Sequence, residues 1–308
     1  MITFSKLGFK GNLGNQLFQI ASTIGIAQKN RHPFSFPAWQ YSNYFENQLP
    51  ITSFEDFFEE LKEEKFNYYE WKLGEGNYDI EGWLQSEKYF DRNKTKEIFT
   101  FKPEFKQKLL KQNQYLFSKK TILISVRRGD FIKHPYYFQL SFQYYFLAII
   151  KNFPDWRDRN LIFTSDDSKY CEYHFSFLKN AYFLKDLSGI EQLVLGSQCD
   201  DFVISNSTFS WWTAWLGEKE NSKIIRPKQN FSSHFREQND DSDYFPSRWI
   251  SFDDSLYKID NKYFVLRVKA ALYILFLNIK FEVLKLAQRI RYAKRKWFGV
   301  FGFNKNSI

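Results

Sequence analysis

Residues 121–130 read TILISVRRGD. The segment TILISV consists of apolar and β-branched residues, which is typical of a short strand buried in a sheet. The segment RRGD follows it directly and leaves two interpretations open. It is either a charged surface turn, or a site where Arg127 and Arg128 hold an anion. The second interpretation rests on the planar fork of donors that a guanidinium presents to phosphate oxygens.

The same pattern of an apolar run followed by a polar turn recurs further along the chain. Strands are predicted within residues 160–167, 181–186, 200–209 and 222–229. Helices are predicted within residues 141–153 and 207–217, the second ending at a glycine. Strands that alternate with helices favour an α/β fold with parallel sheets.

The first part of the chain also begins as strand, turn and helix. Residues 2–9 are β-prone, residues 10–15 supply a glycine-containing turn, and Leu17, Ile20, Ala21 and Ile24 then share one helical face. Two further segments are less regular. Residues 55–66 (EDFFEELKEEKF) predict a helix or a charged surface segment, and residues 78–90 predict a strand and a loop.

Polar residues follow several of these predicted strands. Ligands of parallel α/β sheets bind beyond the carboxyl ends of the strands, so this shared placement predicts a single site. Its candidate residues are Asn15, Arg127, Arg128, Asp166, Asp167, Ser205, Asn206, Ser207 and Thr208. Simpler interpretations exist: a tight turn at residues 11–14, helix capping by the aspartates, and helix capping by the Ser/Thr group. For the segment SNSTFSWWTAWLG we expect both, with polar residues binding and tryptophans packing.

The composition limits the class of protein. The chain has 308 residues, of which 44% are hydrophobic, which allows two domains and argues against disorder. Two cysteines do not make a disulfide framework, and motifs of zinc enzymes and serine hydrolases are missing from the sequence. The first residues lack the apolar core of a signal peptide, and the apolar runs are too short to span a bilayer. We therefore expect a cytoplasmic protein without a metal site.

The last part of the chain has a different charge from the rest. Residues 258–308 contain 12 Lys/Arg and 2 Asp/Glu, although the whole chain has a net charge of only +9. Val283, Leu286 and Ile290 fall on one helical face. A basic amphipathic helix of this kind binds an anionic membrane surface, or it packs on protein. We favour the membrane and do not expect nucleic acid as a partner.

Taken together and in this order, several motifs resemble the alpha-1,2-fucosyltransferases of glycosyltransferase family 11. Two positions depart from the family pattern: Asn12 replaces a glycine, and Ser125 replaces the histidine that usually opens the arginine motif. The resemblance covers roughly residues 1–255 and rests on GNLGNQLFQIA (11–21), GWLQSEKYF (82–90), VRRGDF (126–131), FTSDDSKYC (163–171), SNSTFSWWTAWLG (205–217) and, more weakly, residues 224–253.

The resemblance implies the GT-B-like fold, in which two Rossmann-like domains with parallel sheets face each other. Residues 1–118 would then form the acceptor-side domain, residues 119–257 the GDP-sugar-binding domain, and residues 258–308 the basic tail. It also implies an inverting transfer of L-fucose from GDP-fucose, without a divalent metal, to a hydroxyl such as galactose O2. The expected acceptor is a bacterial surface glycan (O antigen or capsule) or a lipid-linked oligosaccharide, with the enzyme peripheral on the inner face of the plasma membrane. The alternatives are another nucleotide sugar as donor, or a membrane-associated binding protein without catalysis.

Hypothetical roles for the candidate residues follow from the resemblance. Arg128 would clamp the β-phosphate of GDP, while Arg127 would bind the donor or brace Asp130. Asp130 would accept the acceptor's proton or only orient an arginine. The remaining candidates would bind the donor: the guanine edge for Asp166 and Asp167, the sugar or pyrophosphate for Asn15 and Gln16, and phosphate oxygens for Ser205, Asn206, Ser207 and Thr208.

Overall fold

The computed structural model describes residues 1–52 and 58–301, with side chains described up to residue 292. Contacts between Cα atoms group Met1–Tyr257 into one compact unit and Lys258–Ile308 into a second. Each unit is described by itself below. The predicted division of the first unit at residues 118 and 119 stays a prediction.

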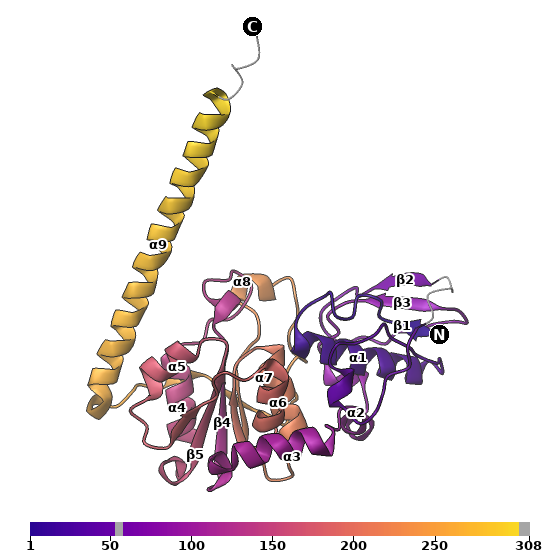
Figure 1. Cartoon of the computed structure of the whole chain (residues 1–308), viewed down its shortest axis with the longest axis horizontal. Helices are drawn as coiled ribbons and strands as arrows, with labels where there is room; N and C mark the ends of the chain where they lie inside the picture. Colours follow the sequence, from indigo (N-terminus) through magenta and orange to yellow (C-terminus); the bar gives the residue numbers. More distant parts are fainter. Residues whose placement is uncertain (53–57, 302–308) are drawn as a thin grey trace. The chain divides into compact units, whose positions relative to one another are not determined.

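A six-stranded parallel sheet forms the larger part of the first unit (Figure 1). Its strands lie in the order β6-β5-β4-β7-β8-β9. The chain thus moves outward in one direction from β4 and in the other from β7, which makes the space between these two strands a topological switch point. The bounds are β4 (Thr121–Val126), β5 (Asn160–Ser165), β6 (Ala181–Phe183), β7 (Asp201–Ile204), β8 (Ile224–Pro227) and β9 (Ile250–Phe252).

The sequence pattern explains why β4 lies at the centre. All of its residues are buried, as expected for a strand of a parallel sheet that helices cover on both faces. Ser125 pairs with Thr164 of β5 on one side and with Ile204 of β7 on the other. The connecting helices of this part are α4 (Phe142–Asn152), α5 (Ser168–Phe175), α6 (Gly189–Gly196), α7 (Thr208–Gly217) and α8 (Ser233–Arg236).

A second parallel sheet of three strands lies in the first part of the chain, in the order β1-β3-β2. Its strands are β1 (Ile2–Thr3), β2 (Glu59–Lys62) and β3 (Tyr78–Glu81). The helices here are α1 (Leu13–Lys29), α2 (Arg92–Ile98) and α3 (Pro103–Gln112). The predicted α/β architecture with parallel sheets is therefore confirmed, with an N-terminal sheet much smaller than the C-terminal one.

For residues 55–66 the sequence predicted a helix or a charged surface segment. For the residues that the structure describes there, the helix is wrong, whereas the charged surface segment is confirmed because Glu59, Glu60 and Lys62 are exposed. Glu59–Lys62 form strand β2, which pairs in parallel register with β3. Backbone pairing with a distant strand overrides the helix propensity of this glutamate- and lysine-rich segment. Residues 53–57 lie outside the described residues.

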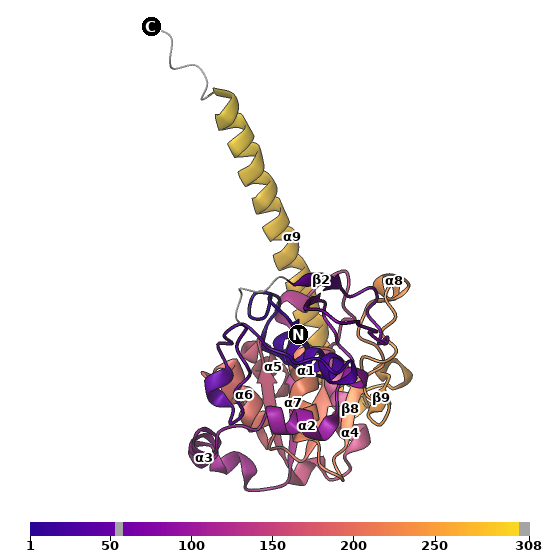
Figure 2. The same cartoon turned by 90° about the vertical axis from the view of Figure 1, so that its right-hand side faces the viewer.

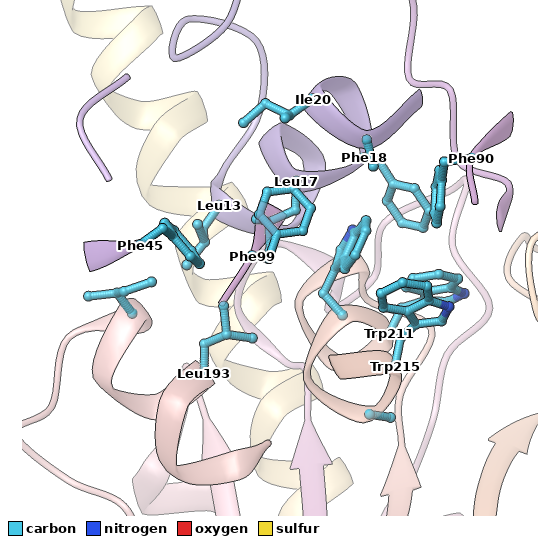
Figure 3. Close-up of a cluster of buried hydrophobic side chains, with 14 of the residues drawn as sticks. Leu13, Leu17, Phe18, Ile20, Phe45, Phe90, Phe99, Leu193, Trp211 and Trp215 are labelled. Carbon is cyan, nitrogen blue, oxygen red and sulfur yellow. The ribbon is translucent and has the colours of Figure 1, made fainter. Parts of the chain in front are cut away.

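Helix α1 packs against α7 and joins the two parts of this unit, as two perpendicular views show (Figures 1 and 2). Phe18 of α1 lies with its ring centroid 4.5 Å from that of Trp211 (Figure 3). Its centroid lies 5.1 Å from that of Trp212. Trp211, Trp212 and Trp215 are fully buried. Buried aromatic pairs contribute about 0.5–1.5 kcal/mol each beyond their apolar area, so this interface holds the two parts together. The expected packing role of the tryptophans is confirmed.

The second unit consists mainly of α9 (Phe264–Phe301). Up to residue 292, apolar side chains along this helix are largely exposed, among them Leu272, Ile279, Val283, Leu286 and Ile290. Among the described residues, the helices do not combine the length and apolar character that crossing a membrane requires. The predicted C-terminal helical extension is thus present.

Candidate functional site

A pocket of about 160 Å³ lies at the carboxyl ends of β4, β5 and β7, beside the switch point. Of the residues predicted for the site, Arg127, Asp166 and Ser207 line it. The other lining residues are Ser125, Val126, Thr164, Ser165, Gly189, Gln192, Phe209 and Ser210. Most of the lining residues have polar or charged side chains, among them one arginine and one aspartate.

Arg127 is held between two carboxylates at the mouth of this pocket. Its Nη2 lies 2.5 Å from Asp130 Oδ1, and its Nη1 lies 3.2 Å from Asp166 Oδ2. The side chain of Asp130 is 64% exposed, whereas that of Arg127 is 24% exposed. Asp130 thus stands in the bracing geometry that the sequence left open, and its alternative role in proton transfer stays a prediction.

Asp166 also holds the backbone of the turn that follows β4. Asp166 Oδ1 accepts a hydrogen bond of 2.9 Å from the backbone N–H of Arg128. The guanidinium of Arg128 lies over the ring of Tyr170, 4.1 Å from its centroid. A Cβ on Gly129 would collide with the Asp166 carboxylate, so a larger residue there would require that carboxylate to move. The predicted guanine contact of Asp166 stays a prediction.

Three buried serines form a group at the pocket, of which Ser125 and Ser210 line it and Ser205 lies behind them. Ser210 Oγ lies 2.7 Å from the Oγ atoms of both Ser125 and Ser205. Ser207 caps α7, since its Oγ accepts a hydrogen bond of 3.2 Å from Phe209 N–H. The N-terminus of α7 therefore points its positive end toward the pocket, where an anion is favoured.

Asn206 is buried and its side-chain amide connects two loops. Its Nδ2 donates to the backbone oxygens of Phe138, at 3.1 Å, and Asn230, at 2.7 Å. The buried carboxylate of Asp241 in turn accepts hydrogen bonds from the backbone N–H groups of Asn230 and Phe231. The Asn206 amide group is thus committed to holding these loops at the end of β7.

The candidates on α1 and α5 also use their side chains internally. Gln16 is buried; its Nε2 donates to Gly11 O and its Oε1 accepts from Trp39 Nε1, both at 2.9 Å. Asn15 Oδ1 accepts from Gln85 Nε2 at 2.9 Å. Asp167 caps α5 by accepting from Tyr170 N–H at 3.0 Å, which is the simpler interpretation considered from the sequence. Asn15, Gln16 and Asp167 are not among the described residues that line the pocket.

Thr208 connects the two halves of the site. It is the first residue of α7, and a Cβ on Gly14 of α1 would lie 2.8 Å from its Oγ1. The glycine turn at residues 11–14 therefore reaches the N-terminus of α7. The structure brings this turn to the same region as the arginine motif, although the two are more than a hundred residues apart.

Sequence reasoning missed the contribution of α6 to the pocket, through Gly189 and Gln192. A signal was available, because Ser188 and Glu191 form a capping box at the start of this helix. Sequence reasoning also missed Glu63, which lies just beyond β2. Burial raises the pKa of its carboxyl to about 7. The local sequence contains no signal for that burial.

Chemically, the pocket suits an anionic ligand. An arginine and the N-terminus of a helix meet there, and such groups stabilise phosphate charge. His, Cys, Asp and Glu side chains do not gather in groups of three or more suited to a metal within the part of the chain that the structure describes.

The fold is thus doubly wound α/β, with a pocket at its switch point that Arg127 and the first residues of α7 line. The chain belongs to glycosyl transferase family 11, whose family model matches residues 6–253.

Two curated relatives and one solved structure are similar to this chain. The O-antigen biosynthesis glycosyltransferase WbnK of Escherichia coli is 31% identical over 37% of this chain and 40% of its own length. An alpha-1,2-colitosyltransferase of Escherichia coli is 27% identical over 58% of this chain and 63% of its own length. The chain thus spans less than two thirds of either relative. The fucosyltransferase NodZ from Bradyrhizobium aligns with a TM-score of 0.49 at 12% identity, over 70% of this chain and 92% of its own.

Proposed function

We propose that this protein transfers L-fucose from GDP-fucose, with inversion, to a hydroxyl of a bacterial surface glycan, with galactose O2 as the expected position. The observation that carries the proposal is the convergence of Arg127 and the N-terminus of α7 at the switch-point pocket of a family 11 member. Arg128 does not line the pocket but follows Arg127 in the same turn, where its guanidinium lies over the ring of Tyr170. The role of one relative in O-antigen biosynthesis supports the class of acceptor.

The proposed mechanism follows from where charge develops. As the bond between the sugar and GDP breaks, negative charge builds on the β-phosphate oxygen, and preorganised cations and N–H donors stabilise it. Arg128 supplies a planar fork, and its stacking on Tyr170 fixes the plane of that fork. Arg127 is oriented by Asp130 and Asp166, so it needs little reorganisation when the donor binds.

The substitution Arg128→Lys tests the clamp, because it keeps the charge and removes the fork. We expect the transfer rate to fall about 100-fold or more and the stabilisation of the protein by GDP in a thermal melt to shrink. Arg157→Lys is the matched control, since Arg157 also stacks on an aromatic ring, that of Trp156, outside the pocket. Near-normal transfer and GDP stabilisation in the Arg128 variant would refute the clamp.

A second donor is favoured by one specific observation. A relative transfers colitose, and the present chain has Ser125 lining the pocket where the family usually has histidine. Thermal melts with GDP-fucose, GDP-colitose and UDP-galactose separate the donors, because the true donor raises the melting temperature most. No stabilisation by any nucleotide, together with silent pocket variants, would instead favour a non-catalytic binding protein.

We further propose that transfer requires no divalent metal, with the arginines taking the place of a cation at the leaving group. Assays in the presence of EDTA test this. Unchanged transfer is expected, and full loss of activity that Mg²⁺ or Mn²⁺ restores would refute it.

We also propose that α9 holds the protein on the anionic inner face of the plasma membrane. Its exposed apolar residues would enter the interface while its basic residues approach lipid phosphates, each contributing about 1 kcal/mol. Vesicles containing anionic lipid should bind the full chain, and Val283→Asp with Leu286→Asp should abolish that binding. The control is Gln288→Asp, which adds a negative charge at an exposed polar position of the same helix. Equal binding by all variants would reject the membrane role.

A further inference from the structure

Backbone hydrogen bonds hold the carboxylate of Glu63 at the carboxyl edge of the small sheet. Glu63 follows the last residue of β2, and its backbone N–H donates to Glu81 O at 2.7 Å. Its Oε2 accepts from the backbone N–H of Trp83 at 2.7 Å, and its Oε1 accepts from that of Leu84 at 3.0 Å. Each carboxylate oxygen can accept a further hydrogen bond, so these two contacts orient the group without saturating it.

The backbone that holds Glu63 is specialised for this contact. A Cβ on Gly82 would lie 2.6 Å from Glu63 Cβ and 2.9 Å from its Oε2, so only glycine leaves room for the carboxylate. Leu84 has a φ of 54°, in the left-handed region that costs a non-glycine residue about 1–3 kcal/mol. Its carbonyl accepts a hydrogen bond of 2.8 Å from Ser22 Oγ, which helps to hold this conformation. Leu84 therefore keeps a strained backbone conformation at the residue whose N–H donates to Glu63.

The surroundings of this carboxylate suit a sugar. Trp83 is 40% exposed, and Lys10 Nζ lies 5.1 Å from its ring centroid. An exposed indole offers a flat apolar surface to the C–H face of a pyranose, while a neighbouring cation and carboxylate offer a donor and an acceptor to its hydroxyls. Lys10 is itself anchored by Glu81, 3.2 Å away.

Contacts connect this position with the start of α7, where Ser207, Phe209 and Ser210 line the pocket. Gln85, next to Leu84, donates to Asn15 Oδ1 at 2.9 Å, and the adjacent Gly14 packs on Thr208. Further along the first segment, Phe66 lies with its ring centroid 4.7 Å from that of Phe231. The carboxyl edge of the small sheet is thus joined on two sides to the loops that surround the carboxyl end of the large sheet.

The pKa of the Glu63 carboxyl also suits a general base. Burial raises the pKa of its carboxyl to about 7, although the two N–H groups and Lys10 act in the opposite direction. The other titratable groups that act electrostatically with it are Tyr69 and Tyr89, whose pKa values burial raises, while Glu64 acts on Tyr69. A general base is most effective when its pKa lies near the working pH.

We propose that Glu63, Trp83 and Lys10 form the acceptor subsite and that Glu63 is the general base of the transfer. The inference rests on the proposed function. The acceptor hydroxyl donates its hydrogen bond to the Glu63 carboxylate. As the acceptor oxygen bonds to the anomeric carbon, the proton passes to Glu63, the bond from that carbon to the β-phosphate oxygen breaks, and its electron pair leaves with GDP. Asp130 then only orients Arg127.

The test compares Glu63→Gln with Glu64→Gln, its exposed neighbour, in the full chain. Transfer from GDP-fucose to lactose and N-acetyllactosamine is measured from pH 5 to pH 9, together with stabilisation by GDP. We expect the wild-type rate to fall as the pH drops below about 7, where Glu63 becomes protonated. The Glu63 variant should lose about 100-fold or more in kcat and lack this acidic limb, with GDP stabilisation retained. The Glu64 variant should resemble wild type.

Trp83→Ala provides an independent variant, since Trp83 is partly exposed and its removal leaves the carboxylate in place. It should raise the KM for the acceptor about tenfold without changing the KM for the donor. Wild-type pH dependence and kcat in Glu63→Gln would overturn the base, and an unchanged acceptor KM in Trp83→Ala would overturn the subsite. If the wild-type protein neither transfers a sugar nor is stabilised by any nucleotide, the proposed function itself fails, and this inference falls with it.

Discussion

Gly14 of α1 packs directly on Thr208 at the start of α7, and a Cβ at position 14 would lie 2.8 Å from Thr208 Oγ1. This contact lets the N-termini of two helices from different halves of the first unit approach each other. The glycine turn and the segment SNSTF therefore meet at the pocket because one position between them has no side chain.

Gly14→Ala should destabilise the protein by about 1–3 kcal/mol, because the added methyl group meets the backbone of Phe209 and the side chain of Thr208. Denaturant unfolding measures this loss. The control is Gly189→Ala, since a Cβ there would meet no heavy atom within 4 Å. Equal stability of the two variants would contradict the close packing of α1 on α7.

Asn206→Ala should destabilise the protein by about 2–3 kcal/mol, because it removes two hydrogen bonds and leaves the carbonyls of Phe138 and Asn230 without this buried donor. Asn206→Asp should be worse, since a carboxylate would face both oxygens. Urea unfolding gives the ranking. If Asn206 mainly bound a ligand, both variants would keep wild-type stability and lose only GDP stabilisation.

Asp201→Asn should cost far more stability than Asp155→Asn, although both aspartates pair with Arg159. The side chains of Arg159 and Asp201 are only 8% and 3% exposed, whereas that of Asp155 is 52% exposed. Breaking a buried pair from one side costs about 3–5 kcal/mol, and an exposed pair contributes about 0–1 kcal/mol. Similar unfolding midpoints for the two variants would contradict the buried pair.

Stability should also depend on Glu63 in a pH-specific way. Burial raises the pKa of the folded carboxyl from 4.5 to about 7, so the folded state binds more protons between these values and loses stability as the pH rises. At about 1.4 kcal/mol per pKa unit, the loss is at most about 3.5 kcal/mol. Glu63→Gln should remove this slope between pH 4.5 and pH 7, which unfolding curves at several pH values can measure. An unchanged slope would place the Glu63 carboxyl in water.

The pattern of the sequence predicted the large sheet well. Apolar runs such as TILISV formed strands where expected, because a strand buried on both faces needs a continuous apolar segment. The strand within residues 55–66 was not predicted, because this segment of glutamate, leucine and lysine forms a strand only through pairing with β3. The segment itself contains no β signal.

The sequence predicted the place of some candidate site residues but not of others. Arg127, Asp166 and Ser207 follow strands and line the pocket, so their position depended on chain order alone. Gln16 and Asn206 stand in equally polar motifs, yet their amides are used by Trp39, Phe138 and Asn230, which are distant in sequence.

The sequence by itself therefore determined most strands of the large sheet, the polar turns that follow them, and the resemblance to a glycosyltransferase family. These depend on periodicity, turn residues and motif order, which are local properties of the chain. Only the tertiary structure decided which polar groups reach the pocket, and that the half-buried carboxylate of Glu63 accepts hydrogen bonds from Trp83 and Leu84 N–H and has a raised pKa. Burial and hydrogen-bond partners depend on segments brought together from far apart, so no local pattern encodes them.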